Sequence, residues 1–182
     1  MALKATVYKA QLNVADTDRG YYADHPLTLA LHPSETEERL MVRLLAYALH
    51  AGEHLAFTRG ISTDDEPDLW EKDLTGDIVR WIEVGLPDDT RIRKACNRSR
   101  EVVVIAFGAR APEIWWEKTA PALARFDNLT VLRIPAEAGA ALAALAGRTM
   151  EWQVTIQDGI AFVSSQGSSV EVQPETWRRS GR

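Results

Sequence analysis

The stretch EPDLWEKDLTGDIVRWIEVG, residues 66–85, decides how this chain is interpreted. The segments DLWEKD and DIVRWIEVG within it predict two short strands with a short connector between them. Asp68 lies near the start of the first strand, and Glu83 lies near the end of the second. In an antiparallel pair these two ends are adjacent, so we expect the two carboxylates to lie close together.

The composition is that of one ordinary globular domain. The chain has 182 residues, of which 46% are apolar and 26% charged, and this length suffices for a sizeable core. The net charge of −5 excludes a protein that coats nucleic acid by charge alone, so any such contact needs a local basic patch. Cys96 is the only cysteine, which excludes an intrachain disulfide and a thiolate metal cage.

The chain carries no signal for a membrane or for export. Its first residues, MALKATVYKAQLNV, alternate apolar and polar side chains and lack the continuous apolar core of a signal peptide. No apolar stretch approaches the roughly 18–20 residues that span a bilayer. We therefore expect a cytoplasmic protein without membrane contact, taken as a monomer, with one domain over residues 1–182.

The order of the expected elements predicts the fold class. Residues 3–14 and 27–31 predict a strand hairpin, and residues 34–51 predict a helix with Ser34 as its N-cap, Glu37 in a capping box and Gly52 as its stop. Further along, helices and buried strands alternate, and Asp158-Gly159 predicts a second hairpin near the C-terminus, followed by a frayed tail. We expect an α/β (α+β) fold: a mixed central sheet flanked by helices, with the two hairpins extending its edges.

A basic segment follows Glu83 directly. The run RIRKACNRSR, within an expected helix over residues 88–98, is the densest positive run of the chain. Arg91, Lys94 and Arg98 are spaced i, i+3, i+7 and share one helical face. A carboxylate pair beside such a face suits a phosphodiester of DNA or RNA, with Arg91 and Arg98 on phosphates. The alternative is a solvated amphipathic helix with Ile92, Ala95 and Cys96 on its apolar side.

Two resemblances arise from these residues. The PD at 67–68 and the IEVG at 82–85, in a helix-strand-strand-strand-helix-strand order, look like the core of the PD-(D/E)xK nucleases. The segments MALKATVYKAQLNVADTDRGYYADHPLTLA, HPSETEERLMVRLLAYALHAG and PDLWEKDLTGDIVRWIEVGLPDDTRIRKACNRS resemble the YaeQ family over nearly the whole chain. This resemblance implies a variant of the restriction-endonuclease-like fold and, by analogy, a Mg²⁺ site.

The resemblance also implies roles for single residues. Asp68 and Glu83 match the acids that hold the metal, and Glu38 on the first long helix matches an acid that nuclease cores often place there. The motif lysine is absent, because Gly85 stands at its position. Lys94 on the next helix is the expected substitute, and Lys72, four residues after Asp68 on the same strand face, is the alternative.

Two functions follow as hypotheses. The first is a Mg²⁺-dependent phosphodiesterase acting on DNA or RNA, with Asp68 and Glu83 on the metal, Glu38 orienting a water and Lys94 replacing the missing lysine. The second is a catalytically inactive nuclease-fold module that binds nucleic acid or a protein partner. A zinc site at HAGEH, residues 50–54, is disfavoured because Gly52 stands where the helix should end.

Overall fold

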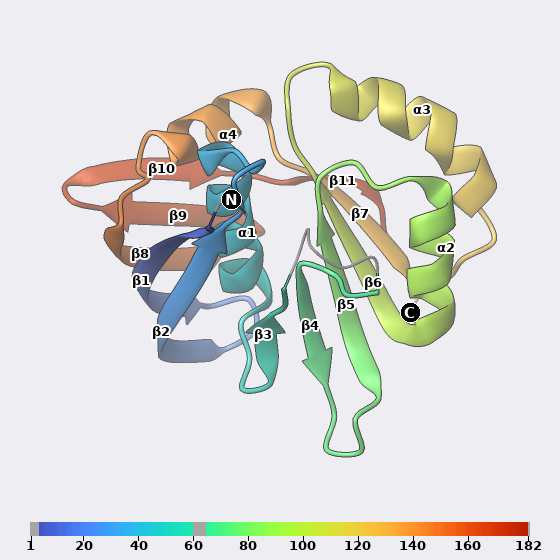
Figure 1. Ribbon diagram of the computed structural model, residues 1–182, viewed down its shortest axis with the longest axis horizontal. Helices are drawn as coiled ribbons and strands as arrows, with labels where there is room; N and C mark the ends of the chain where they lie inside the picture. Colours follow the sequence, from blue (N-terminus) through green and yellow to red (C-terminus); the bar gives the residue numbers. More distant parts are fainter. Residues whose placement is uncertain (1–3, 60–64, 182) are drawn as a thin grey trace. The chain divides into compact units, whose positions relative to one another are not determined.

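The computed structural model describes residues 4–59 and 65–181, and the strands in these ranges form two mixed sheets (Figure 1). The predicted α/β class is confirmed. The chain divides into two compact units. The first contains the residues up to Ala51 together with Glu137–Pro174, and the second contains Gly52–Ala136 together with Glu175–Arg182. The expectation of one domain stays a prediction.

The first unit is a five-stranded sheet in the order β10-β9-β8-β1-β2 with two helices. Its elements are β1 (Thr6–Asp16), β2 (Tyr21–Leu31), α1 (Glu37–His50), α4 (Ala136–Ala143, of which only Ala136 falls in the other unit), β8 (Thr149–Gln157), β9 (Ile160–Ser165) and β10 (Ser168–Val172). Burial alternates along β1 and β8, so one face of this sheet is buried and the other faces solvent. Tyr8 of β1 donates a hydrogen bond to Glu37 of α1 at 3.2 Å on the buried face.

The second unit is a six-stranded sheet in the order β11-β7-β6-β5-β4-β3. Its elements are β3 (Leu55–Phe57), β4 (Leu69–Lys72), β5 (Ile78–Val84), α2 (Asp89–Arg98), β6 (Ser99–Ala106), α3 (Ala111–Leu123), β7 (Leu129–Arg133) and β11 (Glu175–Arg178). The strands β5, β6 and β7 run parallel, because α2 and α3 form the crossovers between them. Residues of α2 and α3 pack with Trp81, Val102 and Val131 of the sheet into one core.

The two predicted hairpins exist, but the expectation that they extend the edges of a central sheet is wrong. β1 and β2 pair antiparallel, as do β8 and β9 around Asp158. Instead of joining the six-stranded sheet, the hairpins join each other, because β1 pairs parallel with β8 from Lys9↔Thr149 to Asp16↔Ile156. Burial alternates along both strands, so pairing them places their apolar side chains on one shared face of the five-stranded sheet.

Four local expectations are also corrected. The N-cap of α1 is Thr36, which accepts from the Arg39 amide at 3.2 Å, and not Ser34, whose hydroxyl bonds His32 instead. The helix ends at His50, before Gly52. β2 begins at Tyr21 rather than at residue 27, because an edge strand tolerates Pro26. The tail is not frayed, since β11 pairs with β7. Leu3, at the start of the first predicted strand, lies outside the described residues.

Candidate carboxylate site

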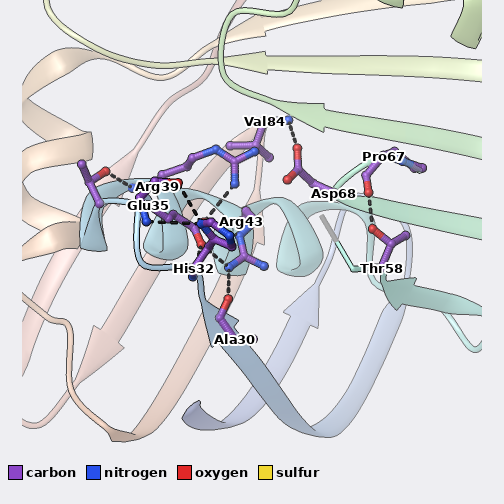
Figure 2. Close-up of polar contacts among 11 residues, drawn as sticks. Ala30, His32, Glu35, Arg39, Arg43, Thr58, Pro67, Asp68 and Val84 are labelled. Carbon is purple, nitrogen blue, oxygen red and sulfur yellow. Dashed lines mark hydrogen bonds and ion pairs between the residues drawn. The ribbon is translucent and has the colours of Figure 1, made fainter. Parts of the chain in front are cut away.

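The structure brings Asp68 and Glu83 together in the second unit. Asp68 directly precedes β4, whose first residue Leu69 pairs with Ile82 of β5. The Asp68 amide donates to the Ile82 carbonyl at 3.1 Å, and its Oδ2 accepts from the Val84 amide at 2.8 Å (Figure 2). These bonds fall on either side of Glu83, so the two acids lie next to each other across the pair. Both are buried, Asp68 being 3% and Glu83 5% exposed.

Polar partners hold the Glu83 carboxylate in one orientation. Its Oε1 accepts from the Trp81 indole nitrogen at 2.8 Å and from Nε of Arg91 at 2.8 Å. Within the described residues, no hydrogen-bond donor reaches Oε2. Burial and the negative charge of Asp68 raise the pKa of Glu83 to about 7, while Arg91 and Trp81 oppose this rise. The negative charge of Asp68 thus disfavours ionisation of Glu83, as expected for two adjacent carboxylates.

The backbone conformation favours glycine at position 85, where the expected motif would have lysine. Gly85 follows β5 with a φ of 119°, a conformation that side-chain-bearing residues rarely adopt. Its amide donates to the Ile105 carbonyl at 2.9 Å, which holds it in this conformation. A lysine here would be strained even though a Cβ would meet no atom within 4 Å.

The two candidate lysines have other contacts. Nζ of Lys94 lies 2.6 Å from Oδ1 of Asp65 in an exposed ion pair. Nζ of Lys72 lies 3.8 Å from the centre of the Trp70 ring. The register of the β4–β5 pair shifts here because β5 carries an extra residue, Val79, between Arg80 and Ile78, whereas β4 continues without interruption. The placement of Lys72 on the face of Asp68 therefore stays a prediction. The catalytic role of Lys94 stays a prediction.

The cation that contacts the Glu83 carboxylate is Arg91. Sequence reasoning assigned this residue to phosphate, yet its guanidinium bonds Glu83 and also donates to the Glu66 carbonyl at 2.8 Å. The signal that could have found it is its position in the first turn of the helix that directly follows β5. Arg98, the second predicted phosphate contact, donates to the Asp65 carbonyl at 3.3 Å and lies over the Trp81 ring.

Glu38 lies in the first unit. It is on α1, and its carboxylate lies so close to Gly139 of α4 that a Cβ there would stand 2.6 Å from Oε1. Its role as a water-orienting acid stays a prediction. The residues of the HAGEH segment do not share a helical face, because α1 ends at His50 and His54 lies in the following turn.

The donor set of the pair fits a small oxygen-preferring cation in part. Mg²⁺ is commonly held by one or two carboxylates, with water and phosphate completing its shell. Asp68 and Glu83 supply two carboxylates, and Oε2 of Glu83 accepts no bond that a cation would have to replace within the described chain. No cluster of three or more His, Cys, Asp or Glu side chains suited to a metal occurs in residues 4–59 and 65–181. The pair alone would hold such an ion.

These features define an α/β protein with a buried carboxylate pair at the β4–β5 strands of a mixed sheet. The family model described as "YaeQ protein" matches residues 1–174, and the chain belongs to the YaeQ family. The YaeQ protein of Escherichia coli strain K12 is 48% identical over 179 residues, which cover 98% of this chain and 99% of that protein.

Two solved structures have the same fold as this chain. The crystal structure of YaeQ from Xanthomonas axonopodis pv. citri shares 55% identity at a TM-score of 0.92, covering 96% of this chain and 98% of that one. The YaeQ structure from Pseudomonas syringae shares 40% identity at a TM-score of 0.92, covering 96% and 97%. Among the described helices, none has both the length and the apolarity needed to cross a membrane.

Proposed function

We propose that this chain is a divalent-cation-dependent phosphodiesterase acting on DNA or RNA, with a restriction-endonuclease-like core in its second unit and its place of action in the cytoplasm. The observation that carries the proposal is the burial of Asp68 and Glu83 side by side, which raises the pKa of Glu83 to about 7. Burying two neighbouring acids opposes folding, and such arrangements are concentrated at functional sites.

Asp68 and Glu83 would hold Mg²⁺. When bound, this ion would supply a more acidic water and positive charge near a phosphodiester. The Val84 amide fixes Asp68, and the Trp81 indole fixes Glu83, so both carboxylates are oriented before any ligand arrives. Arg91 stabilises the negative charge of the pair and, in its forked geometry, is suited to bind a phosphate oxygen.

A cleavage assay with matched variants tests this function. Single- and double-stranded DNA and RNA would be incubated with Mg²⁺ or Mn²⁺ and the wild type, Asp68→Asn or Glu83→Gln. These substitutions keep the size of each side chain and remove one charge. We expect cleavage by the wild type only, and thermal stabilisation by Mg²⁺ that both variants lose. Equal stabilisation of all three proteins would show that the ion does not bind at the pair.

The second candidate is a non-catalytic module that binds nucleic acid or a protein. Three observations favour it: Gly85 at the lysine position, Lys94 paired with Asp65, and Lys72 over Trp70. Wild-type protein that binds an oligonucleotide but never cleaves it, with either metal, would select this function.

A further inference from the structure

Three cations of α2 contact the short segment Asp65–Glu66. Lys94 places Nζ 2.6 Å from Oδ1 of Asp65, and Arg98 donates to the Asp65 carbonyl at 3.3 Å. Arg91, one turn before Lys94, donates to the carbonyl of the next residue, Glu66, at 2.8 Å. These three cations are the i, i+3, i+7 stripe of the helix, and Asp65–Glu66 lies along it.

The charges around Asp65 are unequal. The hydrogen bond and charge of Lys94 lower the pKa of Asp65, and the charges of Arg98 and Arg91 lower it further. Three positive groups therefore act on one carboxylate. The other cations of the same segment differ, since Arg93 pairs with Asp89 and Arg100 contacts the two acids Asp73 and Asp77. Within the stripe, Arg91 also pairs with Glu83, so Lys94 and Arg98 are the two cations that have Asp65 as their neighbouring acid.

The contact on Asp65 is weak enough to be replaced. The Asp65 side chain is 78% exposed and that of Lys94 is 46% exposed. Exposed ion pairs contribute little to stability, because water screens them and both side chains lose freedom. A carboxylate resembles a phosphate in presenting anionic oxygens to guanidinium and ammonium groups, but a nucleic-acid strand carries one such charge on every nucleotide.

We propose that the Asp65 carboxylate occupies a phosphate-binding position on α2, and that a backbone phosphate of a nucleic-acid strand displaces it from Lys94, beside Arg98. The choice of ligand rests on the proposed function. Asp65 thereby competes with anions for the stripe and lowers their affinity. A nucleic-acid strand, which contributes several phosphates, binds despite this competition. The stripe begins at Arg91, which bonds Glu83, so a bound strand would run from the carboxylate pair along the helix.

A binding titration in EDTA tests this without involving cleavage or metal. The probe is a labelled single-stranded DNA of about 16 nucleotides at low salt. Asp65→Asn removes the competing charge, and Asp89→Asn is the matched control, because it also removes one acid paired with a cation of α2, but off the stripe. We expect Asp65→Asn to bind about fivefold tighter than the wild type, the upper range for an exposed ion pair, and Asp89→Asn to bind nearly as the wild type does.

Lys94→Gln completes the experiment. In the wild-type background it should weaken binding and reduce the salt dependence by about one ion, and it should cancel the gain of Asp65→Asn in the double variant. If Asp65→Asn and Asp89→Asn raised the affinity for DNA equally, the effect would come from net charge alone and the proposal would be overturned. A failure of Asp65→Asn to bind the DNA would also overturn it. Such a failure leaves the Mg²⁺ melting and cleavage results untouched, so the two proposals are judged separately.

Discussion

Glu83 gives the stability of this protein a defined pH dependence. Its pKa is raised from 4.5 to about 7, so the folded state keeps a proton that the unfolded chain has already lost in this range. The contribution of Glu83 to the free energy of unfolding therefore falls as the pH rises from about 4.5 to about 7, and is constant outside that window. The shift corresponds to roughly 3 kcal/mol.

The measurement is urea unfolding of the wild type and Glu83→Gln at a series of pH values from 4 to 8. The difference between the two curves isolates Glu83, because the other titrating groups are common to both proteins. We expect the wild type to lose stability relative to the variant across the window. A constant difference at every pH would show that the folded Glu83 titrates as it does in the unfolded chain.

Gly85 permits a second test at the scale of one residue. At a φ of 119°, a Cβ is strained whatever space surrounds it. Gly85→Ala should lower the free energy of unfolding by about 1–2 kcal/mol. Gly147→Ala is the control, because its φ lies outside the positive region and its nearest atom would stand at an ordinary 3.7 Å. Equal stability of the two variants in chemical unfolding would contradict the strain.

At the scale of elements, a buried ion pair fixes the start of α1. Glu35 accepts from Nε of Arg43 at 2.7 Å and from its NH2 group at 3.0 Å, and Arg39 also bonds it (Figure 2). Arg43 donates in addition to the Ala30 carbonyl of β2 at 2.8 Å. This network joins the end of β2 to the helix.

Removing the acid of this pair should be costly. Glu35→Ala removes a carboxylate that accepts two hydrogen bonds from the buried Arg43, and should lower the free energy of unfolding by about 3–5 kcal/mol. Glu101→Ala, which breaks the more exposed pair with Arg80, should cost less than about 1 kcal/mol. Chemical unfolding measures the free energy of unfolding of both variants. Similar losses of stability would mean that burial does not determine how much an ion pair contributes.

The elements that depend on local sequence patterns were predicted correctly, and those that depend on contacts between distant residues were not. The strands around Asp68 and Glu83 and the basic helix that follows them were predicted from local patterns, and the structure has them. The N-cap of α1 was misplaced because Ser34 and Thr36 are equally suitable chemically, and only the burial of Glu35 on Arg43 decides between them. That contact is invisible to a local pattern.

The candidate site was predictable to the same extent. The proximity of the two acids follows from strand pairing, but Arg91 on Glu83 depends on how α2 is oriented after β5, which spacing alone does not determine. The contact of Lys72 with the Trp70 ring was likewise not predicted, because spacing places the two residues on one strand face without showing what the ammonium group contacts.

At the scale of the whole molecule, the two compact units predict uneven stability. Each has its own sheet, so a local defect in one should open that unit preferentially. Glu35→Ala should therefore speed amide hydrogen exchange in β1 and β8 more than in β6 and β7. An equal increase in both sheets, measured by mass spectrometry, would show that the chain opens as one cooperative structure.

The parallel pairing of β1 with β8 has a consequence for synthesis in the cell. Lys9 of β1 pairs with Thr149 of β8, so β1, which is synthesised early, cannot complete its pairing until β8 has been synthesised. On the ribosome, the segment from Gly52 to Ala136 emerges complete while the first hairpin still has an open edge. An unpaired edge is prone to join other chains, and contacts between distant residues form slowly. The nascent chain is thus most vulnerable to aggregation until residue 157 has left the exit tunnel.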